Sequence, residues 1–277
     1  MELRKHLEIK PKQYPWLSSY GIFLRETLRF LTVPGQTILG PLVSSLIYFC
    51  LFGMALGKFI HPSGADAHSS FTYGYSYILF LIPGIMAMEV INASIQNPMS
   101  SLMIAKWSRT IVDIQLAPVT PLGTWLAFVG GAIVRSFIIV VCVFTAGCLC
   151  AMEIPHNINI ILFIASHIIA VGIFSSLGLI LGIVCKTWEQ AGVVLSFIIQ
   201  PLVFFSGIFF SFQSFPDWLN TFKYINPIFY IVSMFRASIL GIADTQMSLA
   251  FGVSLVFLLV SVFWSQIVLR KGLGTKV

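Results

Sequence analysis

Charged side chains are scarce in this sequence: Asp, Glu, Lys and Arg together make up 9% of its 277 residues. Soluble globular domains carry about 25% charged residues, so this composition excludes an ordinary soluble fold. The apolar share of 57% and the mean hydropathy of +0.93 indicate instead a chain that lies mostly in lipid.

The sequence also lacks the motifs of common nucleotide-binding and hydrolytic sites. It contains no Gly-x-x-x-x-Gly-Lys-[Ser/Thr] phosphate loop, no Gly-rich dinucleotide loop, no His-Glu-x-x-His and no Gly-x-Ser-x-Gly. The five histidines lie far apart, and the five cysteines include no Cys-x-x-Cys pair. We therefore predict that this chain is not an enzyme, has no catalytic residues or metal ligands, and binds no cofactor itself.

Long apolar runs are what the sequence has in abundance. A helix rises about 1.5 Å per residue and needs about 20 residues to cross the hydrocarbon layer, and each run is about that long or longer. Backbone in lipid must satisfy its own hydrogen bonds, so runs of this length predict helices and an all-α polytopic membrane protein. The six predicted spans are residues 34–57, 74–97, 123–152, 159–185, 192–212 and 247–269.

The basic residues predict the orientation. With both termini in the cytoplasm, twelve of the 16 Lys and Arg lie inside, three lie outside and Arg135 lies within a span. This bias follows the positive-inside rule. We expect a single transmembrane domain over residues 1–277, with a cytoplasmic N-terminal region at 1–33, six spans within 34–269, and a cytoplasmic tail at 270–277.

Residues 16–31 are expected to form an amphipathic helix on the membrane surface, ahead of the first span. Arg25, Glu26 and Arg29 fall on other sides of the helical wheel than its apolar positions. The apolar positions, which recur at helical spacing, are Leu17, Tyr20, Leu24, Leu28 and Leu31.

The link between the second and third spans, residues 98–122, predicts a short helix with two faces. Its polar positions are Lys106, Arg109 and Asp113, and its apolar positions are Ile104, Trp107, Ile111 and Ile114. Two interpretations stay open for this helix. It either docks a cytoplasmic partner or only anchors a loop at the interface.

Residues 204–241 are apolar but interrupted, and they do not follow the pattern of a simple span. The pieces at 217–225 and 227–240 are too short to cross the membrane alone, so we expect re-entrant or surface-lying helices at the outer face. The residues that mark this region are Pro216, Trp218, Asn226, Pro227 and Arg236.

Polar residues within the spans are few, and such residues are costly in lipid. Glu89, Asn92 and Gln96 share one helix face, which we expect to meet protein or water. Arg135 lies near the middle of the third span. Either Arg135 pairs with Glu89, or these four residues line a transport path.

Several short motifs occur in a characteristic order. The chain has Ala-Lys-Trp-Ser-Arg-Thr at 105–110, Leu-Ala-Pro-Val at 116–119, Gly130-Gly131 before Arg135, Ser-Gly-Ile-Phe-Phe at 206–210, Pro-Asp-Trp-Leu at 216–219, and Asn-Pro-Ile-Phe-Tyr at 226–230 before Arg236 and Gly241. This order resembles the permease subunit of type-2 ABC exporters, the group that exports drugs, polysaccharides, O-antigens and nodulation factors. The resemblance covers almost the whole chain.

The resemblance implies a six-span permease of the bacterial inner membrane that forms a homodimer and pairs with a separate ATPase subunit. ATP and Mg would be bound by that partner, and the cargo moved outward would be an amphipathic, lipid-like, polysaccharide or drug molecule. Residues 100–117 would include the coupling helix, with Lys106, Trp107, Arg109 and Asp113 facing the ATPase. Residues 16–31 would be the connecting helix, and 212–240 the outer re-entrant region. The alternatives are a secondary transporter and a non-transporting membrane scaffold.

Overall fold

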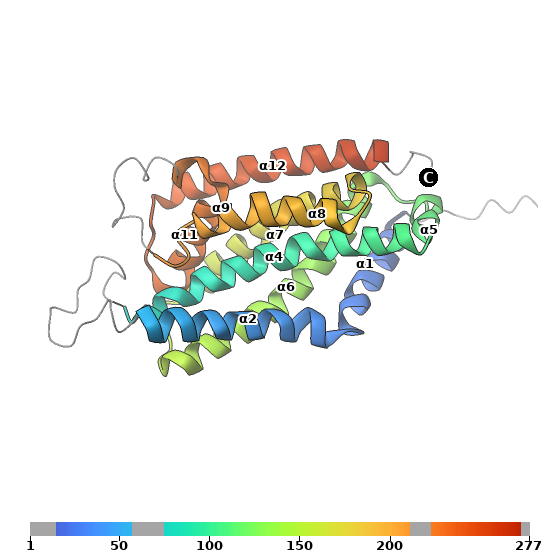
Figure 1. The fold of residues 1–277 in the computed structure, drawn as a ribbon. Helices are drawn as coiled ribbons and strands as arrows, with labels where there is room; N and C mark the ends of the chain where they lie inside the picture. Colours follow the sequence, from blue (N-terminus) through green and yellow to red (C-terminus); the bar gives the residue numbers. More distant parts are fainter. Residues whose placement is uncertain (1–14, 57–74, 211–222, 273–277) are drawn as a thin grey trace, which may run out of the picture.

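The computed structural model describes residues 15–56, 75–210 and 223–272, and within these ranges it is a bundle of helices without strands (Figure 1). At its centre lies α4 (Tyr77–Trp107), whose apolar window is 89% buried. Around α4 pack α6 (Pro121–Ala151), α7 (Ile160–Val184) and α11 (Pro227–Leu240). The prediction of an all-helical polytopic membrane protein is confirmed.

Two features allow α4 to pass through the centre of the bundle. Pro98 lies inside the helix and leaves the carbonyl group of Ser94 without its usual amide donor. The Ser175 hydroxyl of α7 donates to that oxygen at 3.3 Å. On α7, Gly178 and Gly182 face α4, and a Cβ atom built at Gly178 would lie 2.3 Å from the Ile95 oxygen. Small residues four apart thus let the two backbones approach closely.

Five helices are long and apolar enough to cross a membrane, among the residues that the structure describes. A shorter apolar helix, Trp188–Phe204, stands where the fifth of the six spans was predicted, at residues 192–212. It begins earlier because the Thr187 side chain caps its start, and the chain turns after Phe204 through Gly207, whose φ is 84°. Seventeen residues rise about 25 Å, near the lower limit for a span. The five spanning helices are Gly35–Gly53, Tyr77–Trp107, Pro121–Ala151, Ile160–Val184 and Met247–Lys271.

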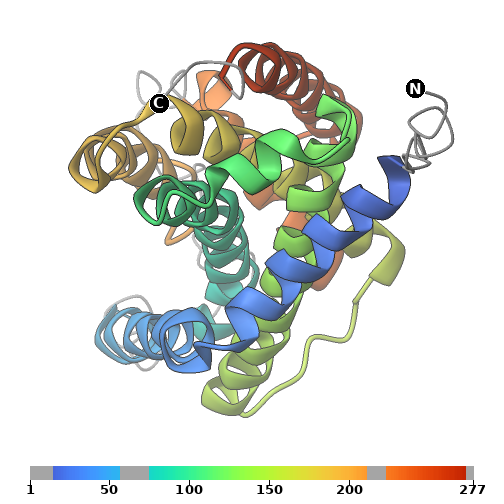
Figure 2. The ribbon, with the colours of Figure 1, turned by 90° about the vertical axis from the view of Figure 1, so that its right-hand side faces the viewer.

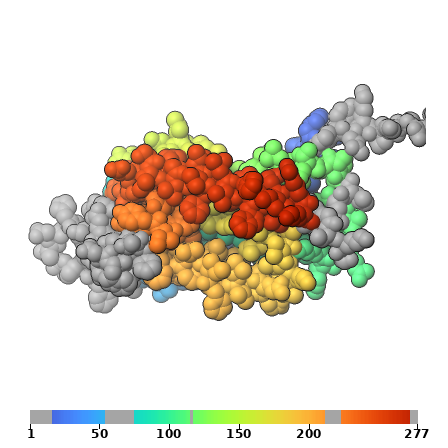
Figure 3. Space-filling model, turned by 90° about the horizontal axis from the view of Figure 1, so that it is seen from above, coloured from blue at the N-terminus to red at the C-terminus, as the bar shows by residue number. Residues whose placement is uncertain are grey.

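Two helices at the rim of the bundle are mostly unburied. One runs from Gly35 to Leu56 through η1 (Gly35–Leu39), α2 (Gly40–Tyr48) and η2 (Phe49–Leu56), and we call it the 35–56 helix. The other is α12 (Met247–Gly272), which forms a ridge on one face of the molecule (Figure 3). Their apolar windows are only 11% and 17% buried. Both carry exposed aliphatic or aromatic side chains, as expected of surfaces that face lipid or another apolar partner.

The predicted amphipathic helix is α1 (Pro15–Leu31), which crosses α6 near one end of the bundle (Figure 2). Its buried face carries the charged Glu26 between the apolar residues Ile22 and Phe30. Leu17, Leu24 and Leu28 are exposed, whereas Glu26 is fully buried. Gly131 of α6 makes room for this contact, because its Cβ position lies 2.7 Å from Cβ of Glu26.

The predicted outer region is described only in part, because Pro216 and Trp218 lie outside the described residues. Pro227 begins α11, and every residue of this helix from Ile228 to Leu240 is buried. The helix lies at the end of the bundle opposite α5 (Ile111–Leu116) (Figure 1). It packs against α4, α7 and α12, which fits a re-entrant helix rather than one on the surface.

Candidate functional site

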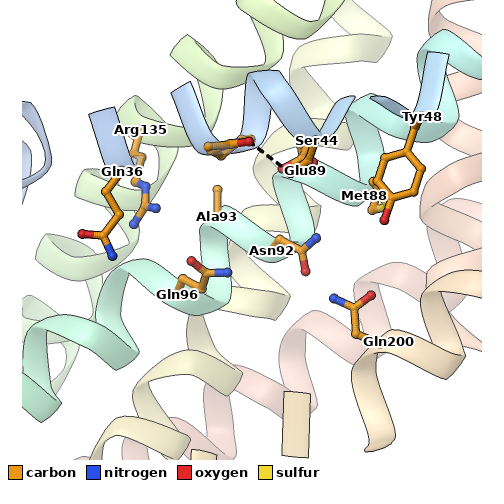
Figure 4. Close-up of a pocket in the computed structure, with 12 residues that line it drawn as sticks. Gln36, Ser44, Tyr48, Met88, Glu89, Asn92, Ala93, Gln96, Arg135 and Gln200 are labelled. Carbon is orange, nitrogen blue, oxygen red and sulfur yellow. Dashed lines mark hydrogen bonds between the residues drawn. The ribbon is translucent and has the colours of Figure 1, made fainter. Parts of the chain in front are cut away.

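A polar cavity of about 300 Å³ opens between the 35–56 helix, α4 and the Trp188–Phe204 helix (Figure 4). The latter consists of α8 (Trp188–Val194), η3 (Leu195–Ile199) and α9 (Gln200–Phe204). Within the described residues, no three His, Cys, Asp or Glu side chains come together as a metal site would require. The polar side chains that line the cavity are Gln36, Ser44, Tyr48, Glu89, Asn92, Gln96, Arg135 and Gln200.

All four of the predicted intramembrane polar residues, Glu89, Asn92, Gln96 and Arg135, line this polar cavity. The described residues include no salt bridge within 4.0 Å between Glu89 and Arg135. Glu89 instead accepts a hydrogen bond from the Ser45 hydroxyl at 3.4 Å. That the four residues line a transport path stays a prediction.

Sequence reasoning missed Gln36 and Gln200, which reach the same polar cavity from two other helices. Each is an amide side chain inside an otherwise apolar run, and this was the signal that could have found them. Gln200 directly precedes Pro201, and Gln36 lies two residues after Pro34. Gln36 and Gln96 are both exposed in the single chain. Exposed amides at this depth are costly in lipid, so this face requires water, cargo or protein against it.

A second cavity of about 420 Å³ continues from the first toward α1. We call it the arginine cavity, because Arg29 and Arg135 both line it. Gln36, Gln96 and Arg135 line both cavities. Arg135 is 6% exposed and has no hydrogen-bond or salt-bridge partner among the described residues, and its Nε is buried and unpaired.

Arg29 belongs to a polar network that fastens α1 to α4. Its guanidinium donates to the backbone oxygen of Asn97 at 2.7 Å and lies 3.3 Å from the buried carboxylate of Glu26. Ser101 donates to Glu26 at 2.6 Å, and Arg25 lies 3.1 Å from the same carboxylate. Burial lowers the pKa of Arg29, and the neighbouring Glu26 opposes that shift.

The link between α4 and α5 forms an exposed elbow, which we define as residues 107–113. The predicted single helix is broken here, because Arg109 has a φ of 59° and separates α4 from α5. The break turns Ile111 and Ile114 into the bundle, whereas Trp107 is 90% exposed. Arg109 and Asp113 are exposed beside Trp107.

Lys106 lies apart from the other three predicted docking residues. Its ammonium group donates to the backbone oxygens of Ile183 and Cys185, the latter at 3.1 Å. These carbonyls belong to the C-terminal end of α7, where a cation is favoured by the helix dipole. Lys106 therefore ties the end of α4 to the end of α7.

At the opposite end, Asn226 and Arg236 hold α11 in place. Asn226 caps α11 by accepting from the Ile228 amide, and it donates to the Leu202 oxygen at 2.6 Å. Arg236 pairs with Asp244, donates to the Gly207 oxygen at 2.7 Å and lies 4.2 Å from the centre of the Phe80 ring. Both side chains thus act within the fold.

Aromatic rings adjoin the polar cavity at its α11 end. Phe209 stacks on Phe52 with centroids 4.4 Å apart, and Phe204 and Tyr48 lie 5.6 Å from it. These rings connect the 35–56 helix with the end of α9 and the turn that follows. Of these four aromatic side chains, Tyr48 lines the polar cavity itself.

The chain is similar to known membrane transport proteins. A family model described as "ABC-2 type transporter" matches residues 20–240. The chain is 31% identical to "Inner membrane transport permease YadH" of Escherichia coli strain K12 over 261 residues, which are 93% of this chain and 97% of that protein.

Two further relatives are more distant. "Probable multidrug ABC transporter permease YbhR" of Escherichia coli strain K12 is 28% identical over 158 residues, which cover 55% of this chain and 41% of that protein. "Nodulation protein J" of Azorhizobium caulinodans is 24% identical over 256 residues, which cover 88% of this chain and 92% of the relative.

Proposed function

Because this chain belongs to the ABC-2 type transporter family and is the membrane permease subunit of an ABC transporter, we propose that it exports an amphiphilic cargo through its polar cavity. The observation that carries the proposal is the cavity itself. Amide, hydroxyl and charged side chains from four helices converge there within an apolar bundle. Polar groups at membrane depth mark a substrate path more often than packing alone.

A second copy of the chain is proposed to cover the open side of the polar cavity. The 35–56 helix and the Trp188–Phe204 helix flank the opening and pack less tightly than α4. Exposed Gln36 and Gln96 would then meet protein, water or cargo instead of lipid. A homodimer with a twofold axis along this face places two such cavities opposite each other.

The ABC-2 family implies a partner ATPase subunit, and we propose that the elbow docks it. ATP and Mg are bound and hydrolysed on that partner, and this chain contributes no catalytic group. Exposed Trp107 is suited to anchor such a contact, because large aromatic side chains dominate protein interfaces. Arg109 and Asp113 supply charges around it.

Movement at the elbow is proposed to reach the polar cavity through α4. One continuous helix carries Trp107 at its end and Gln96, Asn92 and Glu89 about three to five turns further in. A push on Trp107 would therefore shift the cavity wall as a rigid body. Lys106 and the glycine contacts of α7 would move with α4, because they join the two helices.

The chain is a multi-pass membrane protein, and the name of its relative from Escherichia coli supports the bacterial inner membrane. We propose that both termini and the elbow lie in the cytoplasm, as the basic residues predict. Labelling from outside the cell in a background without native cysteines should then spare Ser108→Cys. Efficient external labelling of Ser108→Cys would reverse the orientation.

The test of the proposed docking is copurification of the permease with its ATPase, together with permease-stimulated ATP hydrolysis. Trp107→Ala and Arg109→Glu should lower both, while membrane insertion and thermal unfolding stay normal because these side chains are exposed. Arg270→Glu is the matched control, because Arg270 is also exposed but lies at the end of α12. Wild-type coupling in a Trp107→Ala, Arg109→Glu double variant would refute the docking surface.

A further inference from the structure

The arginine cavity combines two cations with apolar walls. Arg29 lines it from α1 and Arg135 from α6, and Arg135 also lines the polar cavity. Its remaining lining combines apolar side chains with the polar side chains of Thr32, Gln36, Thr37, Gln96 and Ser100. The apolar ones include Phe30, Met99, Trp188 and Leu195. A ligand that fills this space would need an anionic end and an apolar body.

The positive charge in this cavity is not balanced by the described residues. Glu26 is the carboxylate nearest to Arg29, and it is shared with Arg25. Arg135 has no ion-pair partner, and Glu89 lines only the polar cavity, where Ser45 donates to it. The Nε atoms of both Arg29 and Arg135 are buried without a hydrogen-bond acceptor. An uncompensated cation at this depth is costly, and a bound anion would remove that cost.

The walls of the arginine cavity reach the outer surface of the chain. Ile104, Val33 and Trp188 line it and are themselves exposed. On the neighbouring α1, Leu24, Leu28 and Leu31 are also exposed. An acyl or isoprenoid chain could therefore lie against these side chains while its headgroup reaches the two arginines.

We propose that the arginine cavity binds the phosphate group of an anionic amphiphile, with Arg29 and Arg135 on the phosphate and the apolar walls on its hydrocarbon chain. Guanidinium groups present planar pairs of donors that match phosphate oxygens, and one phosphate can accept from two guanidinium groups at once. Gln36 and Gln96 reach the same junction and can receive the rest of the headgroup in the polar cavity. The inference rests on the proposed export function and gives its cargo a chemical class.

The test measures binding to the purified permease without an ATPase, in a neutral detergent, by native mass spectrometry. The probes are dioleoyl phosphatidic acid, dioleoylglycerol and inorganic phosphate. Phosphatidic acid should bind the wild type, and dioleoylglycerol should bind at least about tenfold more weakly because it lacks the phosphate. Arg135→Gln should weaken phosphatidic acid binding by about tenfold or more, and Arg135→Lys should weaken it less.

Arg270→Gln is the matched control, since it removes an equal charge from an exposed site outside the cavity and should leave binding unchanged. Equal binding of phosphatidic acid to the wild type and to Arg135→Gln would overturn the site. If inorganic phosphate bound as tightly as phosphatidic acid, the proposal that the ligand is an amphiphile would be wrong. If Arg135→Gln does not fold, equal binding of the two lipids to the wild type overturns the proposal. This assay needs no ATPase, so a failed docking surface would leave its result unaffected.

Discussion

The two buried arginines of the membrane region, Arg236 and Arg135, lie in opposite surroundings. Arg236 on α11 is fully buried, pairs with Asp244, donates to the Gly207 oxygen and lies over the Phe80 ring. Arg135 on α6 is almost as deeply buried but has no such partner among the described residues. The first cation has an ion-pair partner within the fold, and the second faces two cavities.

The same contrast extends to the helices around each arginine. α11 is buried along its whole length between α4, α7 and α12. The 35–56 helix, which borders the cavities of Arg135, is mostly unburied. The region around α11 is therefore closely packed, and we call it the packed block. The region around the 35–56 helix and the two cavities is open and contains polar side chains without partners among the described residues of the single chain, and we call it the open rim. Stability is expected to depend on the packed block and transport on the open rim.

The largest effect on stability is expected from Arg236→Gln. The change removes the buried ion pair with Asp244 and the donor to the Gly207 oxygen. Breaking a buried ion pair by removing one partner costs about 3–5 kcal/mol. Thermal unfolding in detergent should show a large drop or a loss of folded protein. A midpoint equal to that of the wild type would mean that the packed block does not depend on Arg236.

Gly178→Ala should have the next largest effect on stability. The added methyl group would lie 2.3 Å from the Ile95 backbone oxygen, so α4 and α7 must move apart, at a cost of about 1–3 kcal/mol. Gly192→Ala is the matched control in the open rim, because nothing lies within 4 Å of its Cβ position. Equal unfolding midpoints for the two variants would contradict the difference in packing.

The sequence predicted the helices well because long apolar runs and helical spacing are local signals. Glu89, Asn92 and Gln96 were assigned to one face by their spacing alone, and they line one cavity. The inward turn of Lys106 could not be predicted, because it depends on where α7 ends, 77 residues further along the chain. Likewise, Gln36, Gln200 and Arg29 reach the cavities only through the packing of separate helices.

Arg236 shows a second limit of sequence reasoning. It was assigned to an outer region by its neighbouring prolines and asparagine, and nothing local predicted that Asp244 would fold back onto it across the turn at Gly241. The break at Arg109 is similar. Helical spacing continues through residues 104–114, but the positive φ at Arg109 divides the run into two helices. Ion pairs and helix breaks of this kind depend on tertiary contacts, and the spacing of apolar and polar residues along the sequence does not reveal them.

Arg135→Gln should affect stability little and transport strongly, the reverse of Arg236→Gln. Removing an unpaired buried cation relieves its desolvation, so the unfolding midpoint should stay or rise. The transporter reconstituted with its ATPase should lose cargo movement, because Arg135 lies at the junction of both cavities. A large loss of stability in Arg135→Gln would mean that Arg135, like Arg236, stabilises the fold, and the contrast between the two regions would disappear.

The smallest expected effect is the coupling between Glu89 and Arg135. No salt bridge within 4.0 Å joins the two side chains among the described residues, although both line the polar cavity. The double-mutant cycle of Glu89→Gln and Arg135→Gln, measured by unfolding, should therefore give a coupling energy below about 0.5 kcal/mol. The cycle of Arg236→Gln and Asp244→Asn is the positive control and should give a much larger value. A comparable coupling for Glu89 and Arg135 would mean that the open rim neutralises its own cation, and the need for an external anion would disappear.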